Sequence, residues 1–143
     1  MSHVTTLSFE IKSLDALKMA CKRLGLEFRE NQTTYKWYGH WVGDYPLPKG
    51  FKKEQLGYCT HAIRVPGANY EIGVVVGKNG EITLLWDFWS AGGLENILGK
   101  GGYKLEQAYI IEDGKLEAAK QGYSSIEEEQ ENGDVKLYIE VNE

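Results

Sequence analysis

The first thirty residues follow a pattern that is typical of strand, helix and strand. The first apolar positions alternate with polar ones, as in a half-buried strand, at Leu7, Phe9 and Ile11. The next apolar positions recur at helical spacing, at Leu14, Leu17, Cys21 and Leu24. Ser13 suits the N-cap of this helix, and Gly25 suits its end. Leu26 and Phe28 then resume a strand.

Two later segments have the pattern of β-hairpins. Residues 70–77 and 81–89 flank Asn79-Gly80, and an Asn-Gly pair favours a tight type I′ turn. The second of these strands carries apolar side chains on one face, at Ile82, Leu84, Trp86 and Phe88. Residues 123–131 and 134–141 flank another such pair, Asn132-Gly133. The last strand also has an apolar face, at Val135, Leu137, Ile139 and Val141.

Between the hairpins, residues 94–121 have a mostly helical pattern with glycine interruptions. A short helix with Leu94, Ile97 and Leu98 is predicted to close at Gly99, Gly101 and Gly102. A second helix is predicted to begin near Tyr103, with Ala108, Ile111 and Ala119 on its buried face and Gly122 at its end. Gly114 inside this helix costs about 1 kcal/mol relative to alanine, so we expect a kink or break there.

These elements predict one α+β domain, residues 1–143, built on an antiparallel sheet with two helical segments packed on one face. An amphipathic helix, a glycine and then strands occur twice, at Gly25-Leu26 and at Gly122-Tyr123. A duplicated strand-helix-strand-strand unit is therefore a further hypothesis. A chain of 143 residues buries roughly two-thirds of its unfolded surface and needs no disulfide to fold.

Charge and cysteine content restrict the classes of partner. The net charge of −5 is concentrated in residues 112–143, which hold ten acidic residues and three lysines. This balance argues against duplex nucleic acid as a partner, and the acidic end is interpreted as a solvated strand face and a turn. Two cysteines without CxxC spacing, no secretory signal and no long apolar run predict a cytoplasmic protein without a membrane partner.

Residues 35–58 do not fit the pattern of a core element. They hold seven of the chain's seventeen aromatic residues and four lysines, against two acidic residues. Two interpretations stay open: a long loop pinned to the body by its rings, or a surface that binds a planar ligand, a phosphate or a protein partner. The candidate binding residues are Tyr35, Trp37, Tyr38, Trp41, Tyr45, Lys49, Lys52, Lys53, Asp87 and Trp89.

Asp87 is of interest because aromatic residues surround it in the sequence. A carboxylate among rings is desolvated, and a perturbed carboxylate is a mark of functional sites. The alternative is that Asp87 points away from the face of Trp86 and caps the following loop.

Other arrangements for catalysis or metal binding are weaker. His40, Cys59 and His61 can be assembled as zinc ligands, or as a cysteine nucleophile with its base, but the recognised spacings are missing. Residues 99–102 lack the P-loop spacing and are interpreted as a helix break. We therefore expect no catalytic residue, no metal and no cofactor.

Short matches along the chain carry a family resemblance, at Met1-Ser2-His3, Asp15, Leu17-Lys18, Ala20, Leu24-Gly25, Tyr70, Ile72-Gly73, Asp87, Trp89, Gln121-Gly122, Gly133 and Leu137. In this order the chain resembles the family of hypothetical chloroplast reading frame thirty-five, known as domain of unknown function 1257. The resemblance covers nearly the whole chain apart from residues 40–60, which plastid members largely lack. Members occur in plastids, cyanobacteria, other bacteria and phages, and the resemblance implies a bacterial or phage member with an aromatic insertion. It supplies no catalytic residues.

The sequence therefore favours a non-catalytic binding or adaptor protein that uses the aromatic and lysine side chains of residues 35–58. The alternatives are a small-molecule or nucleotide-binding protein using the same segment, and an enzyme using Asp87 or the His40, Cys59 and His61 group. Antiparallel edges and an acidic hairpin are compatible with a homo-oligomer, but the sequence defines no symmetric interface.

Overall fold

The structure is a computed structural model that describes residues 4–7, 9–41, 43 and 45–141. Five antiparallel strands form the main sheet in the order β1-β5-β4-β3-β2. These strands are β1 (Val4–Thr6), β2 (Glu27–Arg29), β3 (His61–Arg64), β4 (Glu71–Val76) and β5 (Ile82–Asp87). The helices are α1 (Leu14–Leu24), α2 (Leu94–Leu98) and α3 (Tyr103–Lys120). A separate two-stranded sheet contains β6 (Ser124–Glu129) and β7 (Val135–Glu140). The predicted α+β class is confirmed.

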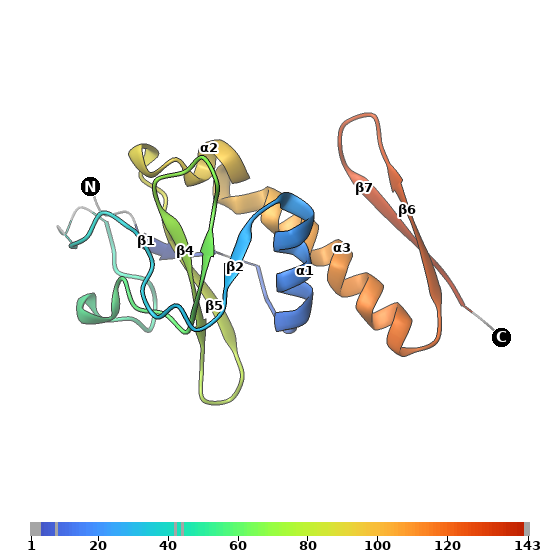
Figure 1. Cartoon of the computed structure of the whole chain (residues 1–143), viewed down its shortest axis with the longest axis horizontal. Helices are drawn as coiled ribbons and strands as arrows, with labels where there is room; N and C mark the ends of the chain where they lie inside the picture. The colour runs from blue at the N-terminus through green and yellow to red at the C-terminus, as the bar shows by residue number, and fades with distance from the viewer. Residues whose placement is uncertain (1–3, 8, 42, 44, 142–143) are drawn as a thin grey trace.

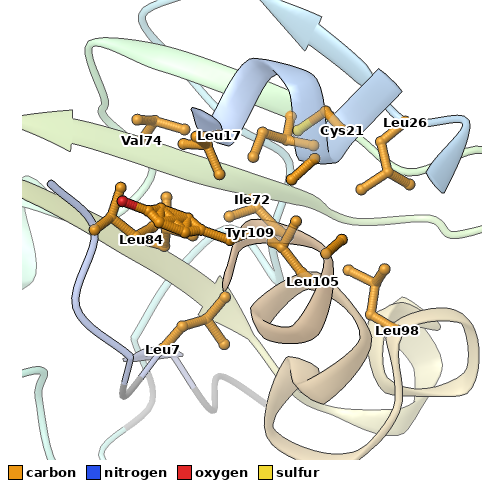
Figure 2. Close-up of a cluster of buried hydrophobic side chains, with 14 of the residues drawn as sticks. Leu7, Leu17, Cys21, Leu26, Ile72, Val74, Leu84, Leu98, Leu105 and Tyr109 are labelled. Carbon is orange, nitrogen blue, oxygen red and sulfur yellow. The ribbon is translucent and has the colours of Figure 1, made fainter. Parts of the chain in front are cut away.

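Helices α1 and α3 lie on one side of the main sheet, as predicted (Figure 1). The core between the helices and the sheet contains Leu17 and Cys21 from α1, Leu105 and Tyr109 from α3, and Ile72, Val74 and Leu84 from β4 and β5 (Figure 2). The Tyr109 hydroxyl accepts the backbone N–H groups of Lys12, at 2.8 Å, and Ser13, at 3.1 Å. This contact ties the start of α1 to α3.

The opposite face of the main sheet is covered by the segment between β2 and β3, which has no α-helix among its described residues. Because side chains alternate along a strand, β5 directs Leu84 and Trp86 toward the helices and Leu85 toward this second face. There Leu85 packs with Tyr35 and Leu56 of the covering segment. The sheet is therefore buried on both sides.

The caps of α1 are those that the sequence predicts. The Ser13 hydroxyl oxygen accepts the Ala16 N–H at 3.1 Å, and Gly25 ends the helix with a left-handed φ of 73°. Strand β2 follows directly and begins at Glu27, so it contains the predicted Phe28 but not Leu26.

The first strand lies earlier than predicted, at Val4–Thr6 instead of residues 7–11. Leu7 still donates its N–H to the Leu84 oxygen at 3.0 Å, and Ile11 forms an isolated bridge with Ile82. Ile11 lies four residues after Leu7, but its partner Ile82 lies only two residues before Leu84. The regular ladder is therefore interrupted between these two contacts. The alternation predicts the buried face correctly, because Leu7 and Ile11 are both buried.

Both Asn-Gly turns differ from the predicted type I′ geometry. In the first, Gly80 donates its N–H to the carbonyl oxygen of Gly77 at 3.0 Å. Gly77 donates its N–H to the backbone carbonyl oxygen of Glu81 at 2.8 Å. Gly80 has a φ of 84°, but Asn79 has no positive φ, which a type I′ turn requires at both central residues. The loop is therefore a type I turn followed by a bulged glycine, and the second turn is the same, with Gly133 at 88°.

Helix α3 is continuous through Gly114, so the predicted kink or break is wrong. A Cβ atom at Gly114 would lie 2.8 Å from Cδ2 of Leu137, which shows that the glycine lets β7 approach the helix. The predicted buried face is also wrong at its end, because Ala118 is buried and Ala119 is exposed.

The C-terminal hairpin is also attached to the helices by charges. Glu127 on β6 accepts a hydrogen bond from the Lys115 ammonium of α3 at 2.9 Å and also pairs with Arg23 of α1. The same Arg23 guanidinium pairs with the buried Glu112 of α3 at 3.2 Å. The acidic end is therefore not only the solvated face that its charge predicts.

The strand-helix-strand-strand order occurs twice, but the two copies pair differently. The strands after α1 join the main sheet, whereas those after α3 pair only with each other among the described residues. No helix in the described part of the chain is long and apolar enough to cross a membrane.

Candidate functional site

Two buried carboxylates hold residues 35–58, the aromatic segment, against the main sheet. Glu71, at the start of β4, accepts the N–H of Lys36 at 3.0 Å and the side-chain amide of Gln32 at 3.1 Å. Asp87, at the end of β5, accepts the N–H of Tyr38 at 3.1 Å. The segment is thereby fixed at two alternate residues by acids from two adjacent strands.

Asp87 has a supporting role in this arrangement. Its side chain is completely buried, and its second carboxylate oxygen accepts the N–H of Trp89 at 3.1 Å. This is the loop-capping interpretation of Asp87. Because a buried carboxylate that holds two backbone amides is not accessible to a partner, the prediction that Asp87 lies on a binding surface is wrong.

Tyr35 is a core residue, so its prediction as a surface binding residue is also wrong. It is 3% exposed, and its ring lies on Gly73 of β4, where an added Cβ would come within 2.5 Å of the ring. Its hydroxyl lies near Gly57 but has no hydrogen-bond partner of acceptable geometry among the described residues. Burial, with smaller contributions from Cys59 and Asp87, raises the pKa of this phenol to about 12.

Several predicted residues contact one another instead of lining one surface. The Tyr38 ring meets Trp89 edge to face, with centroids 5.3 Å apart, and Tyr45 meets Phe88 in the same way at 5.0 Å. Trp41 donates its indole N–H to the backbone carbonyl oxygen of Tyr45 at 3.1 Å. These contacts agree with the interpretation of a loop pinned by its rings.

Part of the segment nevertheless forms a hollow of about 380 Å³. We call it the aromatic hollow, and it is lined by Trp37, Gly39, His40, Trp41, Lys53, Glu54, Leu56 and Tyr58. The Trp37 indole packs closely on Gly57, because a Cβ on Gly57 would lie 2.6 Å from the indole nitrogen. Tyr58 stands on its rim and is 63% exposed. The structure thus brings together three of the predicted residues, Trp37, Trp41 and Lys53.

Three lysines of residues 35–58 have no ion-pair partner among the described acidic residues. These are Lys49, Lys52 and Lys53, and all three are exposed. Only Lys53 lines the hollow. The Lys53 ammonium therefore forms no ion pair with a described residue, although Glu54 also lines the hollow.

The sequence interpretation missed Tyr58 and Glu71. Tyr58 was recognisable as one of the segment's aromatic residues, and its bridge to Thr34 places it beside the hollow. Glu71 was recognisable as the acidic residue that begins an otherwise apolar strand. Its burial depends on the segment that covers it, which lies 35 residues away at Lys36.

The residues considered for other chemistry do not form a reactive group. Burial raises the pKa of the Cys59 thiol to about 11, so it is neutral at physiological pH, and it donates to the Gln32 oxygen at 3.2 Å. His61 accepts the Asn31 N–H on Nδ1 at 2.9 Å, while His40 lines the aromatic hollow. The described residues contain no group of three or more His, Cys, Asp or Glu that could hold a metal ion.

Comparison with known proteins does not assign a function to this site. No family model matches the chain, and no curated protein or solved structure matches it.

Proposed function

We propose that this protein is a non-catalytic binding protein whose aromatic hollow receives a segment of a protein partner. The observation that carries the proposal is the exposed ring of Tyr58 beside Trp37, Trp41 and Lys53 in one hollow. Trp and Tyr are enriched among the few residues that contribute most of the affinity at protein interfaces. Trp37 and Trp41 pack on a second cluster of buried residues that includes Tyr35, Leu56 and Leu85.

The lining favours an apolar or aromatic side chain with an acidic neighbour. The indole and phenol rings provide the apolar contact, and Lys53 provides charge for a carboxylate. The hollow is open to solvent, and this openness suits one side chain of a longer segment.

A small-molecule or nucleotide ligand is the second candidate. The volume of about 380 Å³ falls within the range of ligand pockets, and rings with a lysine can stack a base and bind phosphate. The openness of the hollow favours the protein partner, because a drug-sized ligand is usually enclosed over most of its surface.

The test uses fluorescein-labelled peptides that place one leucine or aromatic residue beside aspartates or glutamates. We expect anisotropy to detect binding, and Tyr58→Ala or Lys53→Glu to weaken it by about fivefold or more. Tyr103→Ala and Lys120→Glu are matched controls, because these side chains are also exposed but lie on α3. Peptides with lysines in place of the acidic residues are expected not to bind.

Equal binding by the wild type and Tyr58→Ala would contradict the proposal. A rise in melting temperature with ATP, GTP or another nucleotide, lost in Lys53→Glu, would instead support the second candidate.

Two further parts of the proposal rest on the sequence. One is membership of the chloroplast reading frame thirty-five family. The other is a cytoplasmic location, with which two free cysteines agree.

A further inference from the structure

The free edge of β7 has a symmetric sequence. Residues 135–141 read Val-Lys-Leu-Tyr-Ile-Glu-Val, with Tyr138 at the centre. Apolar residues occupy equivalent places on both sides of the centre, and a lysine on one side corresponds to a glutamate on the other. β7 pairs only with β6 among the described residues, so its second edge has no strand beside it.

We propose that a second copy of this chain pairs with this edge, antiparallel and centred on Tyr138, to make a four-stranded sheet across the dimer. In this register Lys136 of each copy lies opposite Glu140 of the other. Val135 lies opposite Val141, and Leu137 lies opposite Ile139. Opposite charges and apolar pairs in facing positions stabilise antiparallel strands.

The hydrogen-bonding pattern of the hairpin permits this register. Gln130 donates its backbone N–H to the backbone carbonyl oxygen of Asp134 at 2.7 Å, and bonded pairs then alternate along the ladder. The backbone groups of Lys136, Tyr138 and Glu140 therefore point to β6, and those of the intervening residues point to the free edge. A two-fold axis at Tyr138 makes Val135–Val141 and Leu137–Ile139 the bonded pairs, as an antiparallel ladder requires.

Charge selects this register and this edge. A centre at Leu137 would place Glu140 opposite Asp134, where two acids repel each other. The other edge of the hairpin belongs to β6, where Glu127, Glu128 and Glu129 follow one another, so two such edges repel. The dimer therefore leaves the acidic β6 strands at the outer edges, where they discourage further addition.

The exposed apolar side chains nearby also fit a second copy. Ile139 and Val141 are 46% and 61% exposed, and each would gain an apolar neighbour across the new ladder. Pairing of Val135 with the partner's Val141 brings that valine beside a hollow of about 300 Å³, lined in part by Tyr103, Ile110 and Val135. On the outer face the two Tyr138 rings meet beside Ile126, which pairs with Tyr138 on β6.

Charge exchange tests both the interface and its register. Sedimentation equilibrium of the wild type is expected to show a dimer, and Lys136→Glu or Glu140→Lys alone is expected to raise its dissociation constant about tenfold or more. The double variant with both changes is expected to restore the dimer, because each pair is again opposite in charge. Glu131→Lys and Lys120→Glu change the charge equally outside β7 and are expected to have little effect.

A cross-link provides a second readout. Tyr138→Cys is expected to form a disulfide-linked dimer on mild oxidation, because residues on the axis face each other, whereas Lys136→Cys is not. A monomeric wild type would overturn the proposal. So would a dimer that Lys136→Glu does not weaken, or one that the double exchange fails to restore. Circular dichroism melting checks that each variant is folded.

Discussion

Two regions of this molecule carry apolar side chains outside the main core, and they differ in how far these side chains are buried. The second face of the main sheet is covered by the chain's own segment, which buries Tyr35 and Leu56 against Leu85. The hairpin of β6 and β7 covers one face with α3 and leaves Ile126 and Tyr138 about half exposed on the other.

The difference lies in how each region is anchored. The covering segment is held by the buried carboxylates Glu71 and Asp87, which bind backbone amides. The hairpin is held by a glycine contact at Gly114 and by partly exposed charges at Glu127. Because buried anchors contribute more than exposed ones, we expect the hairpin to open at a lower free energy than the sheet.

The largest expected effect is that of Asp87→Ala. This change leaves the N–H groups of Tyr38 and Trp89 without their acceptor in a buried place. We expect a loss of about 2–4 kcal/mol in the free energy of unfolding, measured by urea denaturation. The exposed Glu131→Ala is the control, and its effect is expected within about 0.5 kcal/mol.

If Asp87→Ala cost no more than Glu131→Ala, the carboxylate would not anchor the segment. The comparison between a firmly held sheet face and a weakly held hairpin would then lose its main support.

Two glycine substitutions compare the regions directly. Gly73→Ala places a Cβ 2.5 Å from the ring of Tyr35, which is fixed between strand and segment, and we expect a loss of about 1–3 kcal/mol. Gly114→Ala meets only the end of the Leu137 side chain at 2.8 Å and gains about 1 kcal/mol of helix propensity. Its net effect in the same denaturation experiment is therefore expected to be close to zero.

Combining Gly73→Ala with Tyr35→Leu tests the cause of the loss. If the clash with the ring is responsible, the double variant is more stable than the sum of the two single changes predicts. Simple additivity would show that the glycine acts through its backbone alone.

The sequence predicted the parts of the fold that depend on local physics. The alternation at Ile82, Leu84, Trp86 and Phe88 identified the core face of β5, and Ser13 identified the start of α1. The prediction failed at Gly114, because the intrinsic cost of glycine in a helix is offset by close contact with Leu137. That contact joins residues that no local pattern connects.

The candidate site was predicted in part for the same reason. Clustered rings located the segment, and Trp37, Trp41 and Lys53 do line one hollow. The sequence did not show which rings the sheet would bury, because this depends on distant residues. Tyr35 lies over Gly73, and the small size of that residue makes room for the ring.

The smallest expected effect concerns the charges that hold the hairpin. Hydrogen bonds from Arg23 and Lys115 lower the pKa of Glu127 from its ordinary value of 4.5 to about 2. The carboxylate therefore stabilises the fold fully above about pH 4.5, and the contribution is lost as pH falls toward 2. Because these side chains are partly exposed, we expect less than about 1 kcal/mol.

The difference in unfolding free energy between the wild type and Glu127→Gln isolates this contribution. We expect the difference to be constant above about pH 5 and to shrink as pH falls, since the protonated glutamate resembles glutamine. Glu128→Gln is the matched control, because its side chain lies on the opposite face of β6 and forms no ion pair with a described residue. A difference for Glu127→Gln that did not change with pH would mean that packing of Leu137 on Gly114, and not charge, holds the hairpin to α3.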